Sequence, residues 1–228
     1  MDNREIEEAA RDLQVRLWYK REELWPSETL LPFQLLEPQR AAKLLGVGFE
    51  RYEELGSFGF KGQQFEVAGL IDRNTNKIVV SLNFEPEVVR FTGAHEIGHF
   101  CMHPGLVMHR DRPIKGTVTE TSPRPKEERE ADHFAACFLV PRKLLVAAFE
   151  ATFQCRHPLH LNDTTAYWLS SGNPESLLNA ETGSLDFAVA VASARSYNGR
   201  RLYSLAAQFR VSVMTMAIRI RELGLIRE

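Results

Sequence analysis

Apolar residues recur every three or four positions in several stretches of the chain, which is the spacing of an amphipathic helix. The first stretch, residues 4–25, ends where a proline follows Trp25, because the residue before a proline prefers an extended backbone. A short helix is predicted over residues 38–45, with a proline at its first position and a glycine just past its end. Two longer helices are predicted over residues 86–102 and 126–139, each followed within two residues by a proline.

Strand signals lie between the second and third of these helices. Residues 64–83 predict two strands of apolar and β-branched residues around the turn Arg73–Asn76, whose asparagines are typical of turns. Residues 105–125 are rich in proline, glycine and charge, which predicts a surface loop. The pattern therefore predicts an α+β class: a mostly helical domain with a small antiparallel sheet and a C-terminal helix-turn-helix-like unit.

A change of composition divides the chain. We expect residues 1–152 to form the main domain. Residues 153–184 are polar and contain His-Pro, Asn-Pro and Thr-Gly breaks, so they predict an insertion with one or two short helices. Residues 153–228 combine this insertion with the C-terminal segment, and we expect both to pack on the same domain.

Composition excludes several classes of protein. The 228 residues carry a formal net charge of −2, with 44% hydrophobic and 25% charged residues, as in ordinary globular proteins. The three cysteines have unrelated spacings, so they imply no disulfide framework. The charged N-terminus does not have the pattern of a signal peptide, and no apolar run has the roughly 18 residues of a membrane span. We therefore expect a cytoplasmic protein without a membrane partner.

The stretch that carries chemistry is His-Glu-x-x-His, which lies inside the predicted helix of residues 86–102. Residues four apart share one helix face at about 6 Å, so His95 and His99 can bind the same metal ion, and zinc suits such ligands. Glu96 is one position further round the helix, where it can serve as general base towards a water molecule. Two incidental histidines on a surface helix are the alternative, and the helical context disfavours it.

A catalytic zinc site needs a third protein ligand. His103 continues the four-residue series, but it is about 12 Å along the helix axis from His95, too far to share one ion. Met102 and Gly105 occupy the positions where a metzincin would have glycine and histidine, which argues against that layout.

The helix of residues 126–139 offers the remaining ligand. Glu128 and Asp132 share one face of it, so Glu128 could complete a site of two histidines and one glutamate. Asp132 could then accept a hydrogen bond from the outer nitrogen of a ligand histidine. For the neighbouring acids Glu127 and Glu130, a solvated face is the better interpretation.

These two motifs together resemble the ImmA/IrrE family of metallopeptidases. The string from His95 to His103, followed by the stretch from Glu128 to Pro141, is similar to its pattern over about residues 60–145. The resemblance implies that the mostly helical domain is a zincin-like metallopeptidase domain, with zinc bound by His95, His99 and Glu128. Family members more often have asparagine at the position of Asp132, where aspartate resembles the thermolysin-like gluzincins. The resemblance also implies a cytoplasmic bacterial or phage-associated endopeptidase. Such an enzyme cuts a helix-turn-helix repressor and so derepresses stress or mobile-element genes.

Two further hypotheses concern binding surfaces. If the strand Lys77–Asn83 is an edge strand, an extended substrate could pair with it along Val79, Val80 and Ser81. At the C-terminus, residues 205–226 resemble a helix-turn-helix, with Ser212 as a cap.

The C-terminal segment bears on the rival class of function, a DNA-binding or adaptor protein with a structural or silent metal site. Arg210, Arg219 and Arg221 are the cations that could contact DNA. Apolar positions outnumber basic ones in this segment, and the whole chain is not basic, which favours a packing role over direct DNA binding. Glu96 favours the enzyme, because a purely structural metal site needs no base.

Overall fold

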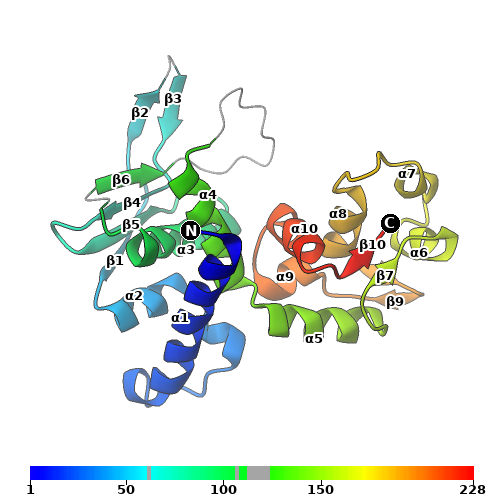
Figure 1. The fold of residues 1–228 in the computed structure, drawn as a ribbon, viewed down its shortest axis with the longest axis horizontal. Helices are drawn as coiled ribbons and strands as arrows, with labels where there is room; N and C mark the ends of the chain where they lie inside the picture. The colour runs from blue at the N-terminus through cyan, green and yellow to red at the C-terminus, as the bar shows by residue number, and fades with distance from the viewer. Residues whose placement is uncertain (61–62, 106–107, 112–123) are drawn as a thin grey trace. The chain divides into compact units, whose positions relative to one another are not determined.

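The computed structural model describes residues 1–60, 63–105, 108–111 and 124–228. The chain divides into two compact units, Met1–Leu139 and Val140–Glu228, and Figure 1 shows its course through both. The division lies before the boundary expected at residue 152. The reason is that helix α5 (Arg142–Phe153) contacts helix α9 (Leu205–Phe209) of the second unit.

The first unit combines helices with small sheets. Its helical segments are α1 (Asn3–Leu24), the 3-10 helix η1 (Pro32–Leu35), α2 (Pro38–Leu45), α3 (Pro86–Met102) and α4 (Lys126–Leu139). Its strands are β1 (Gly48–Tyr52), β2 (Ser57–Phe60), β3 (Gln63–Glu66), β4 (Gly69–Asp72), β5 (Lys77–Ser81) and β6 (Met108–Asp111). The α+β class and the four helices predicted in this unit are confirmed.

Helix α1 illustrates how local sequence and packing agree. Asp2 and Glu5 form a capping box at its first turn, each side chain accepting a hydrogen bond from the other residue's backbone N–H. Its apolar stripe is buried, and the helix packs on α4. Gln14 ties the two helices together, since its side-chain amide donates to the carbonyl oxygens of Cys137 and Phe138 at 2.9 and 3.1 Å. Helix α4 thus packs against both α1 and α3.

The four-stranded sheet has the order β1-β5-β4-β6. Strand β5 pairs in parallel with β1 and antiparallel with β4, while β4 also pairs antiparallel with β6. The sheet is therefore antiparallel, as predicted, except where β1 joins β5. Strands β2 and β3 form a separate antiparallel hairpin, which extends away from this sheet in Figure 1. The turn Arg73–Asn76 joins β4 to β5 as the sequence predicts.

The expected edge strand is an interior strand. Every residue from Lys77 to Ser81 pairs with β1, and Lys77 to Val80 also pair with β4. The prediction that Lys77–Asn83 is an edge is therefore wrong. No free backbone edge remains at Val79, Val80 and Ser81 to receive a substrate, and their side chains are buried.

The second unit consists of short elements. Its helices are α5, α6 (Asp163–Leu169), α7 (Glu175–Leu178), α8 (Asp186–Ser193), α9 and α10 (Val213–Glu222). Its two-residue strands are β7 (Leu159–His160), β8 (Ser196–Tyr197), β9 (Arg200–Arg201) and β10 (Ile226–Arg227), paired as β7 with β10 and β8 with β9. Among the helices that the structure describes, none is long and apolar enough to cross a membrane.

The predicted C-terminal helix pair is confirmed as α9 and α10. Ser212 caps α10, because its hydroxyl accepts from the backbone N–H of Thr215. Arg219, one of the cations considered for DNA, is only 2% exposed. Its guanidinium donates to the carbonyl oxygen of Val140 at 3.4 Å and to Glu222 at 3.1 Å. This arginine holds the start of the unit to α10 and does not face solvent.

Arg219→Ala is therefore expected to destabilise the second unit by about 2–3 kcal/mol, because it removes a buried side chain and leaves the carbonyl oxygen of the buried Val140 without this donor. Arg221→Ala is the matched control on the same helix. Arg221 is exposed and donates to the carbonyl oxygen of Gly183, so its loss should change stability by less than ~0.5 kcal/mol. Urea unfolding of the whole chain measures both. Equal stability of the two variants would contradict the assigned role.

Candidate metal centre

Three side chains converge between helices α3 and α4. The Nε2 atoms of His95 and His99 lie 2.9 Å apart. Oε2 of Glu128 lies 3.6 Å from His95 Nε2, and Oε1 of Glu128 lies 3.3 Å from His99 Nε2. One ligand atom from each residue thus falls within 4.8 Å of the others, so the group could hold a metal ion. Within the part of the chain that the structure describes, this is the only such group.

The helices can bring these residues together because a glycine lies at their contact. A Cβ atom at Gly98 would be 3.0 Å from Cδ1 of Phe134 on α4, so a larger residue would push the helices apart. The centre is buried as a result: His95, Glu96 and His99 are fully buried and Glu128 is 8% exposed. Burying charged groups is costly unless they have partners.

The outer nitrogen of His95 faces a carboxylate. His95 Nδ1 lies 2.9 Å from Oδ1 of Asp132, the partner predicted from the sequence. Arg124 in turn donates to the other oxygen of Asp132 at 2.8 Å and, more weakly, to Oε2 of Glu128 at 3.4 Å. The guanidinium therefore links the two carboxylates on α4 that face His95. Arg124 was not predicted, since it precedes α4 and has no motif of its own.

The outer nitrogen of His99 faces another histidine. His99 Nδ1 lies 2.9 Å from Nδ1 of His103, and His103 Nε2 lies 2.9 Å from Oε2 of Glu130. The interpretation of Glu127 as a solvated residue agrees with its exposure, but the same interpretation of Glu130 is wrong, since Glu130 is buried against His103. The four-residue step from His99 to His103 was a signal that could have found this contact.

Positive groups hold Glu130 from the other side. The amino group of Met1 donates a hydrogen bond to Oε1 of Glu130, and Nζ of Lys126 lies 3.6 Å from the same oxygen. The bond from Met1, with that from His103 added, lowers the pKa of Glu130 from its ordinary value to about 2. Glu130 is therefore a carboxylate at neutral pH.

Glu96 lies where helix α3 passes over strand β4. The strand residue beneath it is Gly69, and a Cβ atom there would be 2.9 Å from Oε1 of Glu96 and 2.5 Å from Cγ2 of Thr92. Only a glycine therefore leaves room for the glutamate at this crossing. Gly69 could not be singled out from sequence patterns, because the crossing of α3 over β4 depends on the tertiary fold.

The end of α3 is capped by a side chain from the β4–β5 turn. Nη2 of Arg73 donates to the carbonyl oxygens of His99, Phe100 and His103 at 3.0, 2.9 and 3.2 Å. These carbonyls belong to the last turn of the helix and its cap, where intrahelical donors run out. Arg73 thus fixes the segment that carries both His99 and His103.

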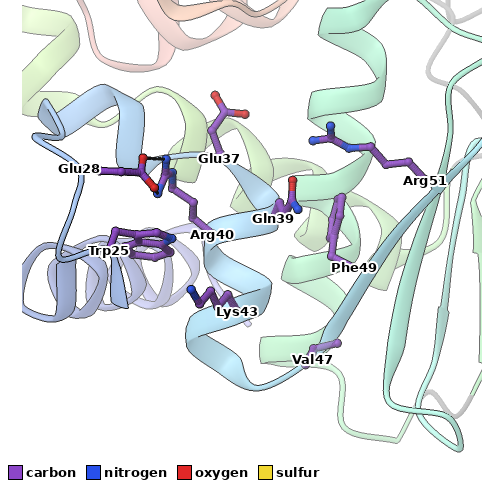
Figure 2. A pocket seen from close by; sticks show the side chains of 9 residues that line it. All are labelled: Trp25, Glu28, Glu37, Gln39, Arg40, Lys43, Val47, Phe49 and Arg51. Atoms are coloured by element: carbon purple, nitrogen blue, oxygen red, sulfur yellow. Dashed lines mark hydrogen bonds and ion pairs between the residues drawn. The ribbon is translucent and has the colours of Figure 1, made fainter. Parts of the chain in front are cut away.

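A hollow of about 550 Å³ in the first unit lies apart from these residues. Figure 2 shows its lining, which consists of Trp25, Glu28, Glu37, Gln39, Arg40, Lys43, Val47, Phe49 and Arg51. Arg40 pairs with Glu28 at 2.6 Å and its guanidinium covers the ring of Trp25. Lys43 donates to the carbonyl oxygen of Leu24. His95, His99 and Glu128 are not among the residues that line this hollow. The charged groups of Arg40 and Lys43 in its lining already have partners within the fold.

A comparison with protein families matches residues 51–161 to a peptidase family, described as the IrrE N-terminal-like domain. This match supports the resemblance of residues 51–161 to the ImmA/IrrE family. A comparison with curated proteins finds no match. The IrrE-type region contains the whole group of His95, His99 and Glu128, and also Glu96 and Asp132. The chain therefore carries a peptidase domain with a buried group of side chains that could bind a metal.

Gly69→Ala tests the fit between β4 and α3 in this IrrE-type domain. The added methyl group has no room between Thr92 and Glu96, so we expect a loss of about 1–3 kcal/mol in the free energy of unfolding. Gly172→Ala is the control, because nothing lies within 4 Å of its Cβ position. Parental stability in Gly69→Ala would show that Thr92 and Glu96 do not need this space.

Proposed function

We propose that this protein is a zinc-dependent endopeptidase. The observation that carries the proposal is the buried group of His95, His99 and Glu128, in which two imidazole nitrogens and a carboxylate face one point. Two histidines and one glutamate are a known donor set of catalytic zinc, which keeps a further position open for water or substrate. The family match supports a peptide bond as the target.

In this proposal Glu96 is the general base. Zinc held by the three ligands would supply Lewis acidity to the attacking water and the scissile carbonyl. The carboxylate of Glu96 would accept the proton of that water and return it to the leaving amine. Asp132 would hold His95 in the orientation and tautomer needed by a ligand.

Burial of Glu96 supports an enzymatic role over the alternative of a silent or structural site. Glu96 is fully buried and belongs to the same helix turn as two ligands. A buried carboxylate costs stability, and such groups gather at functional sites. An adaptor protein with a structural metal would gain nothing from a buried carboxylate beside the metal ligands that offsets this loss of stability.

The substrate we propose is a partner repressor with a helix-turn-helix domain, in a cytoplasmic stress-response or mobile-element system. This rests on the resemblance to known family members. The helix pair α9 and α10 would then serve in packing or in docking the partner, and not in reading DNA. This fits the hydrogen bonds of Arg219 to Val140 and Glu222, which use its guanidinium within the fold. A mass-spectrometric cleavage assay against the product of the neighbouring regulator gene tests the substrate.

Glu96→Gln tests the assigned base. The amide keeps the size of the side chain but cannot accept a proton, so cleavage should fall by about 10²-fold or more while zinc stays bound at one ion per chain. Cleavage rate and metal content, by mass spectrometry and elemental analysis, are the two measurements.

Glu127→Gln is the matched control, since it makes the same chemical change on the exposed side of α4. It should cleave at the parental rate. Removing zinc with a chelator should abolish cleavage by the parent, and adding zinc back should restore it. Cleavage by Glu96→Gln within a few-fold of the parent would remove Glu96 from the mechanism.

A further inference from the structure

The support of the two ligand histidines is unequal. His95 reaches a carboxylate directly, through Asp132 at 2.9 Å. His99 reaches one only through a second imidazole, that of His103, which lies between His99 and Glu130 with 2.9 Å on either side. The rings of His99 and His103 are tilted by 53° with their centroids 5.0 Å apart, so the contact joins ring edges and is not a stack.

The atoms in contact fix where each proton must lie. If His99 binds a metal through Nε2, that nitrogen offers its lone pair, and the ring's proton is on Nδ1. Nδ1–H of His99 can then only donate, and Nδ1 of His103 must accept. A neutral His103 that accepts at Nδ1 carries its own proton on Nε2, where it donates to Oε2 of Glu130. The tautomer of His103 is thus the opposite of that of His99.

We propose that His103 is a positioning residue of the metal centre, which orients His99 as a zinc ligand by accepting its Nδ1 proton and is itself held by Glu130. The inference rests on the proposed function, because it assumes a metal on His99. His103, the third histidine on α3 at a four-residue spacing, would thus act on the metal centre without being a metal ligand.

Two features of the fold make His103 suited to this task. It is the C-cap residue of α3, and Arg73 holds its carbonyl oxygen together with that of His99. Glu130 on α4 is held in turn by Lys126. The ring is therefore fixed from its backbone and from Nε2, and an acceptor that cannot turn away is what a ligand histidine needs.

Nuclear magnetic resonance of the zinc-loaded chain, labelled with ¹⁵N in histidine, reads the tautomers directly. We expect the proton on Nδ1 in His99 and on Nε2 in His103. A proton on Nδ1 of His103 would overturn the proposal, because that nitrogen could then not accept from His99.

Two variants of His103 separate positioning from general structural support. His103→Leu removes the acceptor and should weaken zinc binding by about 10–100-fold, the usual effect of losing an outer partner of a ligand. His103→Gln keeps one acceptor and one donor, so it should bind zinc within a few-fold of the parent. His160→Leu, an exposed histidine in the second unit, is the matched control and should bind as the parent does. Competition with a chromogenic chelator gives each zinc dissociation constant.

The outcomes distinguish this inference from the proposed function. If the parent takes up no zinc, the proposed function fails. If the parent binds one zinc and His103→Leu binds it equally tightly, only the role of His103 fails. Equal weakening in the Leu and Gln variants would also overturn it, since it would mean that ring volume matters and hydrogen bonding does not.

Discussion

The close contact of α3 with α4 is the constraint on which the candidate centre depends. Two of its ligands lie on one helix and the third on the other, and a carboxylate side chain spans only a short gap. Gly98 permits that approach, because a Cβ atom there would lie only 3.0 Å from Cδ1 of Phe134 and the two helices would have to shift to relieve the contact. Helix α1 holds α4 in place from another side, through its buried stripe and the two hydrogen bonds of Gln14. Apolar packing thus sets the distance between polar groups.

That arrangement concentrates ionisable groups where water is excluded, which opposes folding. The structure offsets the cost by giving the polar atoms partners in chains. One chain runs from His95 through Asp132 to Arg124, and the other from His99 through His103 to Glu130. A zinc ion bound by His95, His99 and Glu128 would add positive charge, which would compensate the negative charge of the nearby carboxylates. Removing one partner from either chain should therefore change the orientation of His95 or His99, even where the removed group would not touch the metal.

Sequence periodicity was sufficient for the elements that build the centre and insufficient for what surrounds it. Helices α3 and α4 carry strong local signals, namely an apolar period and prolines just past each end, so His95, His99 and Glu128 could be assigned to facing helices. Strand pairing has no comparable local signal. Nothing within Gly48–Tyr52 indicates that it runs parallel to β5, and this pairing is what turns the expected edge strand into an interior one. Burial of Arg219 and Glu130 was missed for a related reason: charged residues are ordinarily exposed, and only tertiary partners reverse that preference.

The spacing of acids on α4 shows how one short stretch can serve both chains. Glu128 faces the two imidazoles, and Asp132, one turn later on the same face, meets the outer nitrogen of His95. Glu130 points to a different side of the helix, and there the end of α3 presents His103. Both histidines of the candidate centre are therefore oriented from the same helix that carries Glu128. A shift of α4 along its axis would disturb all three contacts together, so the centre should lose its geometry as a unit and not ligand by ligand.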